Sequence, residues 1–301
     1  GKDLQTLLKA ADSAMYAAKS DGKHRYAFYQ PELTIQAEQR LQLEEELRQG
    51  LENNELRLHY QPQIDLIKGK LVGVEALVRW QHPRLGLIAP NEFIGIAERI
   101  GLINLLGEWV LNTACEQAMA WHKMGLPNFR MSVNISPIHF QDPAILDALS
   151  HTLQKTGFTA SDLELEITES VVQTTGDDTD IFEQIRALGV RIAIDDFGTG
   201  YSSFGSLKKL PIDCLKIDRI FVSDMTQDPD SSILFGTIVR VAEALGHDVV
   251  AEGVETQQQV KILQEIGCMT AQGFYFSRPV PASKIPACMN SRFPNTEQGE
   301  D

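Results

Sequence analysis

The chain has 301 residues, of which 43% are hydrophobic and 23% charged, the balance of an ordinary soluble globular protein. This length suffices for a large core, arranged either as one α/β barrel or as two smaller domains. The formal net charge of -14 excludes broad binding to nucleic-acid polymers, which requires a basic surface, but leaves small anionic ligands open. No run of about 18 apolar residues occurs, no signal peptide opens the chain and the cysteines are scattered, so we expect a cytoplasmic location.

The first 30 residues differ from the rest of the chain. Apolar residues at helical spacing predict a helix over residues 7–18, and the aromatic run at 26–29 predicts a short edge strand. One helix and one strand bury no core of their own, so we expect residues 1–30 to be the end of a domain that begins upstream. Pro31 then breaks the chain, and residues 33–52 predict a leading helix.

From residue 55 onward, strand-like and helix-like segments alternate. The strands are expected near 56–64, 70–78, 130–135, 163–168, 190–195, 214–218, 248–253 and 270–276. The helices are expected at 92–106, 108–124, 143–155, 178–188, 231–245 and 256–266. This alternation indicates a TIM-like (β/α)8 barrel, with an open doubly wound sheet as the alternative, although no glycine-rich nucleotide turn follows the first strand. The connection around Lys68-Gly69 is too short for a parallel crossover, so one strand near the start should run antiparallel.

An unusual stretch is VRIAIDDFGTG at 190–200, where a strand expected to be buried ends in two adjacent carboxylates, Asp195 and Asp196. Burying two neighbouring negative charges is unfavourable. Other expected strands also end in an oxygen ligand, namely Glu75, Asn134, Glu166 and Glu252. In a barrel these ends meet at one mouth, where such a cluster requires protons or divalent cations. All-oxygen ligands favour Mg²⁺ or Mn²⁺. Zinc is not expected, because no two histidines occur at the spacing of zinc ligands.

Three further polar residues suit the same mouth. Lys216 lies inside an expected strand, where it is suited to orient water or to offset charge on a phosphoryl group. Arg79, four residues after Glu75, is suited to hold a phosphate with its planar guanidinium. Gln272 is suited to bond a metal-bound water or a nucleobase. The plainer alternatives are an ion pair for Lys216 and a surface amide for Gln272.

Short motifs follow one another in a fixed order along the chain. They are YQP (60–62), EALVRW (75–80), VNIS (133–136), EITE (166–169), DDFGTGYSS (195–203), KIDR (216–219), AEGVET (251–256) and QGF (272–274). Together they resemble the EAL-domain family of cyclic-di-GMP phosphodiesterases, over about residues 35–288. The resemblance implies a TIM-like barrel that binds two Mg²⁺ or Mn²⁺ ions and hydrolyses one phosphodiester of cyclic-di-GMP to linear pGpG.

The resemblance also implies roles for individual residues. The implied metal ligands are Glu75, Asn134, Glu166, Asp195, Asp196 and Glu252. Asp195 is the expected bridge between the two ions. The positive charge of these ions would offset the unfavourable burial of two adjacent aspartates. Ca²⁺ is expected to inhibit, because it prefers longer bonds and higher coordination than Mg²⁺.

The remaining implied roles concern the attacking water and the substrate. Lys216 is similar to the lysine that positions the attacking water, and Glu255 and Gln272 match positions that support the water and the metals. Gln61 and Arg79 match positions that hold the substrate.

Glu169 matches the glutamate that supports the loop beginning at Phe197. Glu166 and Thr168 share one face of their strand, so Glu169 should point elsewhere, towards a neighbouring loop. The loop, FGTGYSSFGS, is rich in glycine and hydroxyl residues and needs such an anchor. The resemblance places a homodimer interface at this loop.

The opening residues, ADSAMYAAKSDGKHRY, resemble the end of a GGDEF domain. The implied domains are a GGDEF remnant (1–30), a linker and leading helix (31–48), the EAL phosphodiesterase domain (49–290) and a flexible tail (291–301). The GGDEF motif itself is absent, so we expect no cyclic-di-GMP synthesis by this chain. The resemblance implies a longer tandem GGDEF–EAL protein, in which absent N-terminal segments are candidates for a membrane anchor.

Two other classes of function remain open. Some EAL domains bind cyclic-di-GMP as receptors without cutting it, but these typically lack a metal ligand, and none is missing here. A Mg²⁺-dependent barrel enzyme of the enolase type also places acids at strand ends, but would not be expected to carry the ordered motifs.

Overall fold

The computed structural model describes residues 28–175, 179–198, 210–226 and 228–290, together with the isolated positions 4, 7, 8, 10, 11, 14, 15, 26 and 293. The chain forms two compact units, which we describe separately. The smaller comprises Gly1–Leu56 and Trp80–Leu102, and the larger comprises Arg57–Arg79 and Ile103–Asp301. All of the polar residues expected at the barrel mouth belong to the larger unit.

The strands close into a barrel in the order β1, β9, β8, β7, β6, β5, β4, β2, and β2 pairs with β1. Their bounds are β1 Leu56–Asp65, β2 Lys70–His82, β4 Arg130–Asn134, β5 Leu163–Thr168, β6 Arg191–Phe197, β7 Cys214–Ile217, β8 Asp248–Ala251 and β9 Thr270–Ala271. In the barrel, β2 and β4 to β9 run parallel to their neighbours, whereas β1 runs antiparallel to β9. The short strand β3 (Gly86–Ile88) pairs antiparallel with the end of β2. The expected TIM-like barrel with one antiparallel strand near the start is confirmed.

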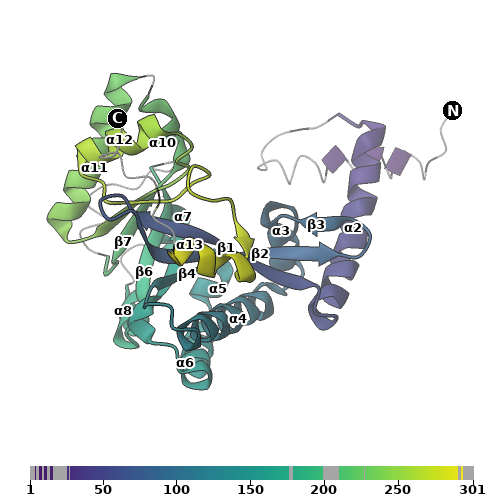
Figure 1. The fold of residues 1–301 in the computed structure, drawn as a ribbon. Coiled ribbons are helices and arrows are strands. Elements are labelled where there is room, and N and C mark those ends of the chain that lie inside the picture. Colours follow the sequence, from purple (N-terminus) through teal and green to yellow (C-terminus); the bar gives the residue numbers. More distant parts are fainter. Residues whose placement is uncertain are drawn as a thin grey trace. The chain divides into compact units, whose positions relative to one another are not determined.

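Helices follow the strands and pack outside them. Those of the larger unit are α4 Ile103–Lys123, α5 Pro137–Gln141, α6 Ala144–Thr156, α7 Glu169–Thr175, α8 Asp180–Ala187, α10 Arg219–Asp224, α11 Pro229–Leu245, α12 Gln257–Ile266 and α13 Ile285–Asn290. Helices α4, α8 and α11 contact β4, β6 and β8 (Figure 1). The larger unit also has short 3-10 turns at Ala160–Asp162 and Ala282–Lys284, and the strand β10 (Val280–Pro281), which pairs with β1.

Three expected segments differ from the structure. The helix expected at 92–106 is interrupted at Gly101, whose φ of 71° is left-handed and ends α3 (Pro90–Arg99) before α4 begins. The strand expected at 270–276 stops at Ala271, because residues 273–276 form a turn. The described residues of the expected edge strand, at positions 26, 28 and 29, form no strand.

The alternation of side chains along β5 shows how the barrel presents polar groups at its interior. Leu163, Leu165 and Ile167 are fully buried on one face, and Glu164 and Glu166 alternate with them on the other. Parallel pairing places polar residues of neighbouring strands side by side. Asn134 of β4, for example, is the register partner of Glu166 of β5. The barrel therefore gathers residues that lie far apart in the sequence.

The smaller unit contains the leading helix, α2 (Pro31–Glu52), as expected from residues 33–52. Trp80, near the end of β2, is fully buried, and its ring contacts Phe93 of α3 edge to face at 5.9 Å. Glu46 of α2 accepts a hydrogen bond of 3.0 Å from His82 Nε2. In the part of the chain that the structure describes, no helix has the length and apolar character needed to cross a membrane.

Candidate active site

Lys216 of β7 lies at the centre of a cluster of carboxylates, with only 1% of the residue exposed. Its Nζ is 2.7 Å from Glu252 Oε1 and 2.8 Å from Glu166 Oε2. It is also 3.1 Å from Asp195 Oδ1 and 3.5 Å from Glu75 Oε2. One ammonium thus joins carboxylates from β2, β5, β6 and the end of β8, which confirms that these strand ends converge.

Glu75 is held by two amides, one at the end of β4 and one directly after β9. Asn134 Nδ2 donates to Glu75 Oε1 at 2.6 Å, and Gln272 Nε2 donates to Glu75 Oε2. Gln272 Nε2 also donates to Gln61 Oε1 at 3.0 Å. Gln61 Nε2 in turn donates to the carbonyl oxygen of Ser277 at 3.0 Å. These bonds fix the Glu75 carboxylate, and they rule out the reading of Gln272 as a surface amide.

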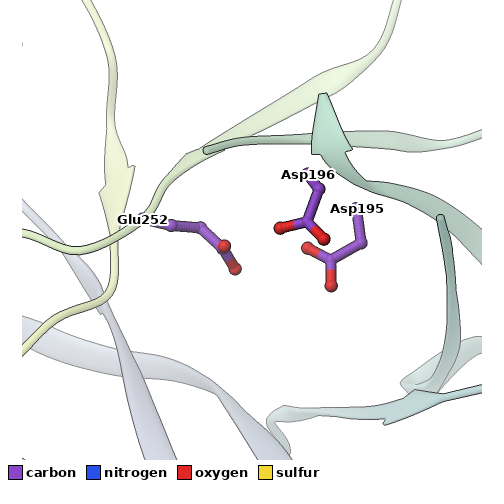
Figure 2. A group of neighbouring side chains, drawn as sticks. All are labelled: Asp195, Asp196 and Glu252. Carbon is purple, nitrogen blue, oxygen red and sulfur yellow. The ribbon is translucent and has the colours of Figure 1, made fainter. Parts of the chain in front are cut away.

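Asp195 and Asp196 both face the same pocket, although adjacent residues of a regular strand point to opposite faces. The backbone departs from a regular strand at this point. Pairing between β6 and β7 shifts register between Ile194 and Phe197, and Asp196 has a φ of 54°, in the left-handed region. One oxygen each of Asp195, Asp196 and Glu252 lie within 4.8 Å of one another, and Figure 2 shows these carboxylates turned towards a common space.

Burial, together with the close packing of acids, raises the pKa of several carboxyl groups. Burial, only partly offset by Lys216, raises the pKa of Glu252 to about 8. Burial, followed by the charge of Asp195, raises the pKa of Asp196 to about 6. Burial and the charge of Glu75 raise the pKa of Glu166 well above its usual value. Without cations, the cluster therefore retains protons near neutral pH.

Two members of the cluster are held in their charged forms. Burial disfavours the ammonium of Lys216, but the surrounding carboxylates outweigh it and raise the Lys216 pKa well above its usual value. Burial also disfavours the Glu75 carboxylate, but Lys216 and the amides of Gln272 and Asn134 lower its pKa below the usual range. The surroundings of Lys216 and Glu75 therefore favour the ammonium and the carboxylate form of these two residues.

A pocket of about 280 Å³ opens above this cluster. Its described lining residues are Gln61, Glu75, Leu77, Asp195, Asp196, Asp218, Arg219, Glu252, Gly253, Glu255, Gln272, Gly273 and Phe274. The pocket thus combines acidic groups with the amides of Gln61 and Gln272, a guanidinium and an aromatic ring.

The donor set fits divalent cations. Five carboxylates, from Glu75, Glu166, Asp195, Asp196 and Glu252, surround or adjoin one ammonium, so their ionised forms leave four negative charges unbalanced. Two divalent cations would balance that excess. The buried Gln272 Oε1 forms no hydrogen bond with any residue that the structure describes, which leaves an additional oxygen without a partner. Oxygen ligands of this kind favour hard ions such as Mg²⁺ and Mn²⁺.

Three residues expected at the site lie around its edge. Glu255 lines the pocket, and its backbone N–H donates to Gln259 Oε1 at 2.8 Å. Arg79 is half-buried on the same face of β2 as Glu75, but it is not among the described lining residues and its Nη1 donates to the Val78 carbonyl oxygen. Glu169 lies outside the acid cluster, at the start of α7, and is buried.

Besides two glycines, four lining residues were not assigned from the sequence: Leu77, Asp218, Arg219 and Phe274. Each lies inside one of the recognised motifs. Leu77, Asp218 and Phe274 lie two residues after Glu75, Lys216 and Gln272, and Arg219 directly follows Asp218. A strand period of two would have suggested Leu77 and Asp218. Apart from their motifs, nothing in the sequence marks Arg219 and Phe274 as lining residues, because the structure places them beyond the strands, in a helix start and a turn.

The sequence of residues 44–279 matches the EAL domain family. The chain belongs to that family. It is 42% identical over 288 residues, 95% of this chain, to the bifunctional diguanylate cyclase/cyclic di-GMP phosphodiesterase MucR of Pseudomonas aeruginosa. It is 40% identical over 283 residues, 94% of the chain, to the cyclic di-GMP phosphodiesterase PdeR of Escherichia coli. The aligned region makes up 42% of each of these two relatives.

A solved structure supports the same membership. The PaMucR phosphodiesterase, solved as a complex with c-di-GMP, is 44% identical in sequence and superposes with a TM-score of 0.78. The match covers 81% of this chain and 99% of that one. The EAL family and its barrel are therefore established for this chain.

Proposed function

We propose that this EAL domain is a metal-dependent phosphodiesterase that hydrolyses one phosphodiester of cyclic-di-GMP to linear pGpG. The observation that carries the proposal is the set of carboxylates from four parts of the barrel around one buried lysine, at the floor of an open pocket. Such a set, complete in its expected oxygen ligands, is an arrangement suited to phosphoryl transfer. The cyclic-di-GMP phosphodiesterase names of MucR and PdeR support the choice of substrate.

The residues that would hold two Mg²⁺ or Mn²⁺ ions are Glu75, Asn134, Glu166, Asp195, Asp196 and Glu252. Bound there, the ions supply a polarised phosphoryl oxygen and an acidified water. Asp195 would contribute to holding both ions, since its carboxylate oxygens lie near Asp196 and Glu252 and also near the Lys216 ammonium, around which Glu75 and Glu166 gather. Asn134 and Gln272 orient Glu75 through their amides.

The other residues handle water and substrate. We assign Lys216 to orienting the attacking water and to offsetting charge on the phosphoryl group, because its ammonium is buried among the acids. Glu255 and Gln272 support that water from the pocket wall. Gln61, at the pocket floor, and Arg79 are assigned to holding the substrate, with Arg79 turning from Val78 towards a phosphate on binding.

Assembly and context are part of the proposal. Glu169 is assigned to anchoring the loop after Asp196, and a homodimer through this loop is proposed; residues 199–209 lie outside the described residues. We also propose an upstream GGDEF domain, since the chain spans about two-fifths of the length of MucR and PdeR, and a cytoplasmic location for this part. Residues 1–30 would be the end of that GGDEF domain.

One experiment tests the proposal directly. The protein is incubated with cyclic-di-GMP and Mg²⁺ and assayed for pGpG by chromatography, with and without EDTA. Formation of pGpG that EDTA abolishes is expected. Tight cyclic-di-GMP binding without any pGpG at saturating Mg²⁺ or Mn²⁺ would instead make the domain a receptor.

A further inference from the structure

A second group of charged side chains lies near the starts of the barrel strands, at the end opposite the acid cluster. Its members are Arg130 of β4, Glu164 of β5, Arg191 of β6 and Asp248 of β8, which we call the basal network. Each precedes one of the expected metal ligands of the same strand, or of the turn directly after it, by two or four residues. Because side chains alternate between the faces of a strand, this even spacing places the basal network and the ligands on the same face.

Glu164 is the buried member of the basal network. Its side chain is fully buried, and donors from both neighbouring strands hold its carboxylate. Ser132 Oγ of β4 donates to Glu164 Oε1 at 3.1 Å. Glu164 Oε2 accepts hydrogen bonds of 3.3 Å from Arg130 Nη1 and from Arg191 Nε. Because Ser132 and Arg191 are the register partners of Glu164, these contacts join β4, β5 and β6 at one level of the barrel.

Asp248 extends the basal network to β8. Its Oδ2 accepts hydrogen bonds from Arg191 Nη2 at 2.6 Å and from Arg130 Nη1 at 3.3 Å. The Asp248 side chain is 56% exposed, so the two guanidiniums reach from a buried carboxylate to one at the surface. The two cations and two anions balance one another, which argues for a role within the fold rather than for an ion-binding site.

The contacts of Glu164 take the place of apolar packing in this part of the barrel. On β6, β7 and β8, a small buried apolar cluster is formed by Ala193, Cys214 and Val250. On β4 and β5, Ser132 and Glu164 precede the expected ligands of their strands by two residues, and Gln63 Nε2 donates to Ser132 Oγ at 3.4 Å. Apolar contacts are not directional, whereas a shift of β4 or β6 along β5 would leave a buried carboxylate without its donors, which is strongly unfavourable.

We propose that Glu164 is a positioning residue for the acid cluster and acts through its ion pairs with Arg130 and Arg191. These pairs hold β4, β5 and β6 in one relative position, which sets the distances among the oxygen ligands that the same strands carry. Errors of about 1 Å in such distances can cost on the order of 10²-fold in rate. The role rests on the proposed function for the identity of the cluster as a metal site, and Glu164 itself binds neither metal nor substrate.

The test is a double-mutant cycle on metal affinity. Mn²⁺ binding without nucleotide is measured by calorimetry for the wild type, Glu164→Gln, Arg191→Gln and the double variant, and kcat and KM for pGpG formation are measured in Mg²⁺. Leu149→Ala, which opens a cavity at a fully buried residue of α6, is the control for a general loss of stability, followed by thermal unfolding in EDTA. If Glu164→Gln does not fold, Asp248→Asn takes its place in the cycle and is judged in the same way, because its exposed side chain tolerates substitution.

Glu164→Gln is expected to weaken Mn²⁺ binding by roughly 10- to 100-fold, the range for residues that orient metal ligands without touching the metal. Arg191→Gln should weaken it as well, although the loss of a positive charge would by itself strengthen cation binding. The double variant should bind no more weakly than Glu164→Gln, because both substitutions break the same ion pair. kcat should fall with little change in KM, and Leu149→Ala should keep the Mn²⁺ affinity of the wild type.

Three results would each overturn the positioning role: unchanged Mn²⁺ binding by Glu164→Gln, stronger binding by Arg191→Gln, or an equal loss of binding by Leu149→Ala. Losses that multiply in the double variant would do the same, since they would make the two side chains independent. If the wild type binds Mn²⁺ but forms no pGpG, the proposed function fails while the Mn²⁺ series still decides the role of Glu164.

Discussion

The carboxylate of Glu169 accepts a hydrogen bond of 3.1 Å from the backbone N–H of Gly198, two residues after Asp196. Glu169 is 4% exposed and begins α7, so helix α7 connects to the strand end that carries both aspartates. This hydrogen bond is consistent with the anchoring role expected for Glu169. It is made to Gly198, the one residue of the loop after Phe197 that the structure describes.

Glu169→Ala should therefore displace Asp196 without unfolding the barrel. A shift of about 1 Å in such a position can cost on the order of 10²-fold in rate. We expect most of the activity to be lost and the Mg²⁺ concentration for half-maximal rate to rise. Glu169→Gln keeps an acceptor oxygen and is the control, expected to retain much of the activity. An unchanged Mg²⁺ dependence in Glu169→Ala, measured by steady-state kinetics, would contradict the anchoring role, and sedimentation would show whether dimers weaken.

Asp196 combines a ligand role with an unusual backbone conformation. Its φ of 54° is tolerated by Asn better than by Ala. Both Asp196→Asn and Asp196→Ala should lose hydrolysis, because both remove a carboxylate. Only Asp196→Ala should also lose stability, by about 1 kcal/mol, as measured by urea unfolding in EDTA. Equal stability of the two variants would show that the conformation carries no strain.

Glu75→Ala should abolish both metal occupancy and hydrolysis while the fold survives. The variant removes a carboxylate that Asn134 and Gln272 hold in place. Calorimetry with Mn²⁺ measures occupancy, and circular dichroism checks the fold. Turnover like that of the wild type at saturating Mg²⁺ would rule out a ligand role for Glu75.

Lys216→Met keeps the length of the side chain and removes its charge. We expect kcat to fall by roughly 10²-fold or more, the scale for charge-stabilising groups. Metal affinity should not fall, since removing the ammonium leaves the carboxylates with no competing cation. A loss of metal binding in step with activity would mean that Lys216 serves only to hold the acids in place.

The raised carboxyl pKa values predict how stability depends on pH. Glu252 has a pKa of about 8 in the folded protein, against an ordinary value of 4.5. The metal-free folded state therefore holds more protons than the unfolded chain between these values, and its stability should fall as pH rises from about 5 to 8, by up to about 1.4 kcal/mol per pH unit for one carboxyl. Thermal unfolding in EDTA measures this.

Two comparisons make that pH prediction specific. Glu252→Gln cannot ionise, so its melting temperature in EDTA should fall less over the same range. Saturating Mg²⁺ should remove the decline in the wild type, because the ions replace the protons. A wild-type profile in EDTA that matches Glu252→Gln would contradict the raised pKa.

Ca²⁺ provides a test of site geometry. It prefers longer bonds and more ligands than Mg²⁺. With Ca²⁺ in place of Mg²⁺, cyclic-di-GMP should bind but remain uncut, and Ca²⁺ added to the Mg²⁺ reaction should inhibit. Robust pGpG formation with Ca²⁺ alone would count against a site built for octahedral ions.

The sequence by itself determined the barrel and most of the cluster. Strands such as LELEIT alternate apolar and acidic residues, and this period of two is a local property of the chain. Once strands are parallel and in register, their polar ends must meet, so Glu75, Asn134, Glu166 and Glu252 could be placed together from the sequence alone.

Only the tertiary structure decided how the adjacent aspartates share one pocket. Regular strand geometry would have sent Asp195 and Asp196 to opposite faces, and the shifted pairing with β7 together with the positive φ of Asp196 prevents this. The place of Phe274 was decided in the same way, since the strand expected to run to 276 ends at Ala271 and the packing of Gly273 on Val254 sets the turn. Both outcomes depend on contacts between segments far apart in the sequence, which local periodicity does not encode.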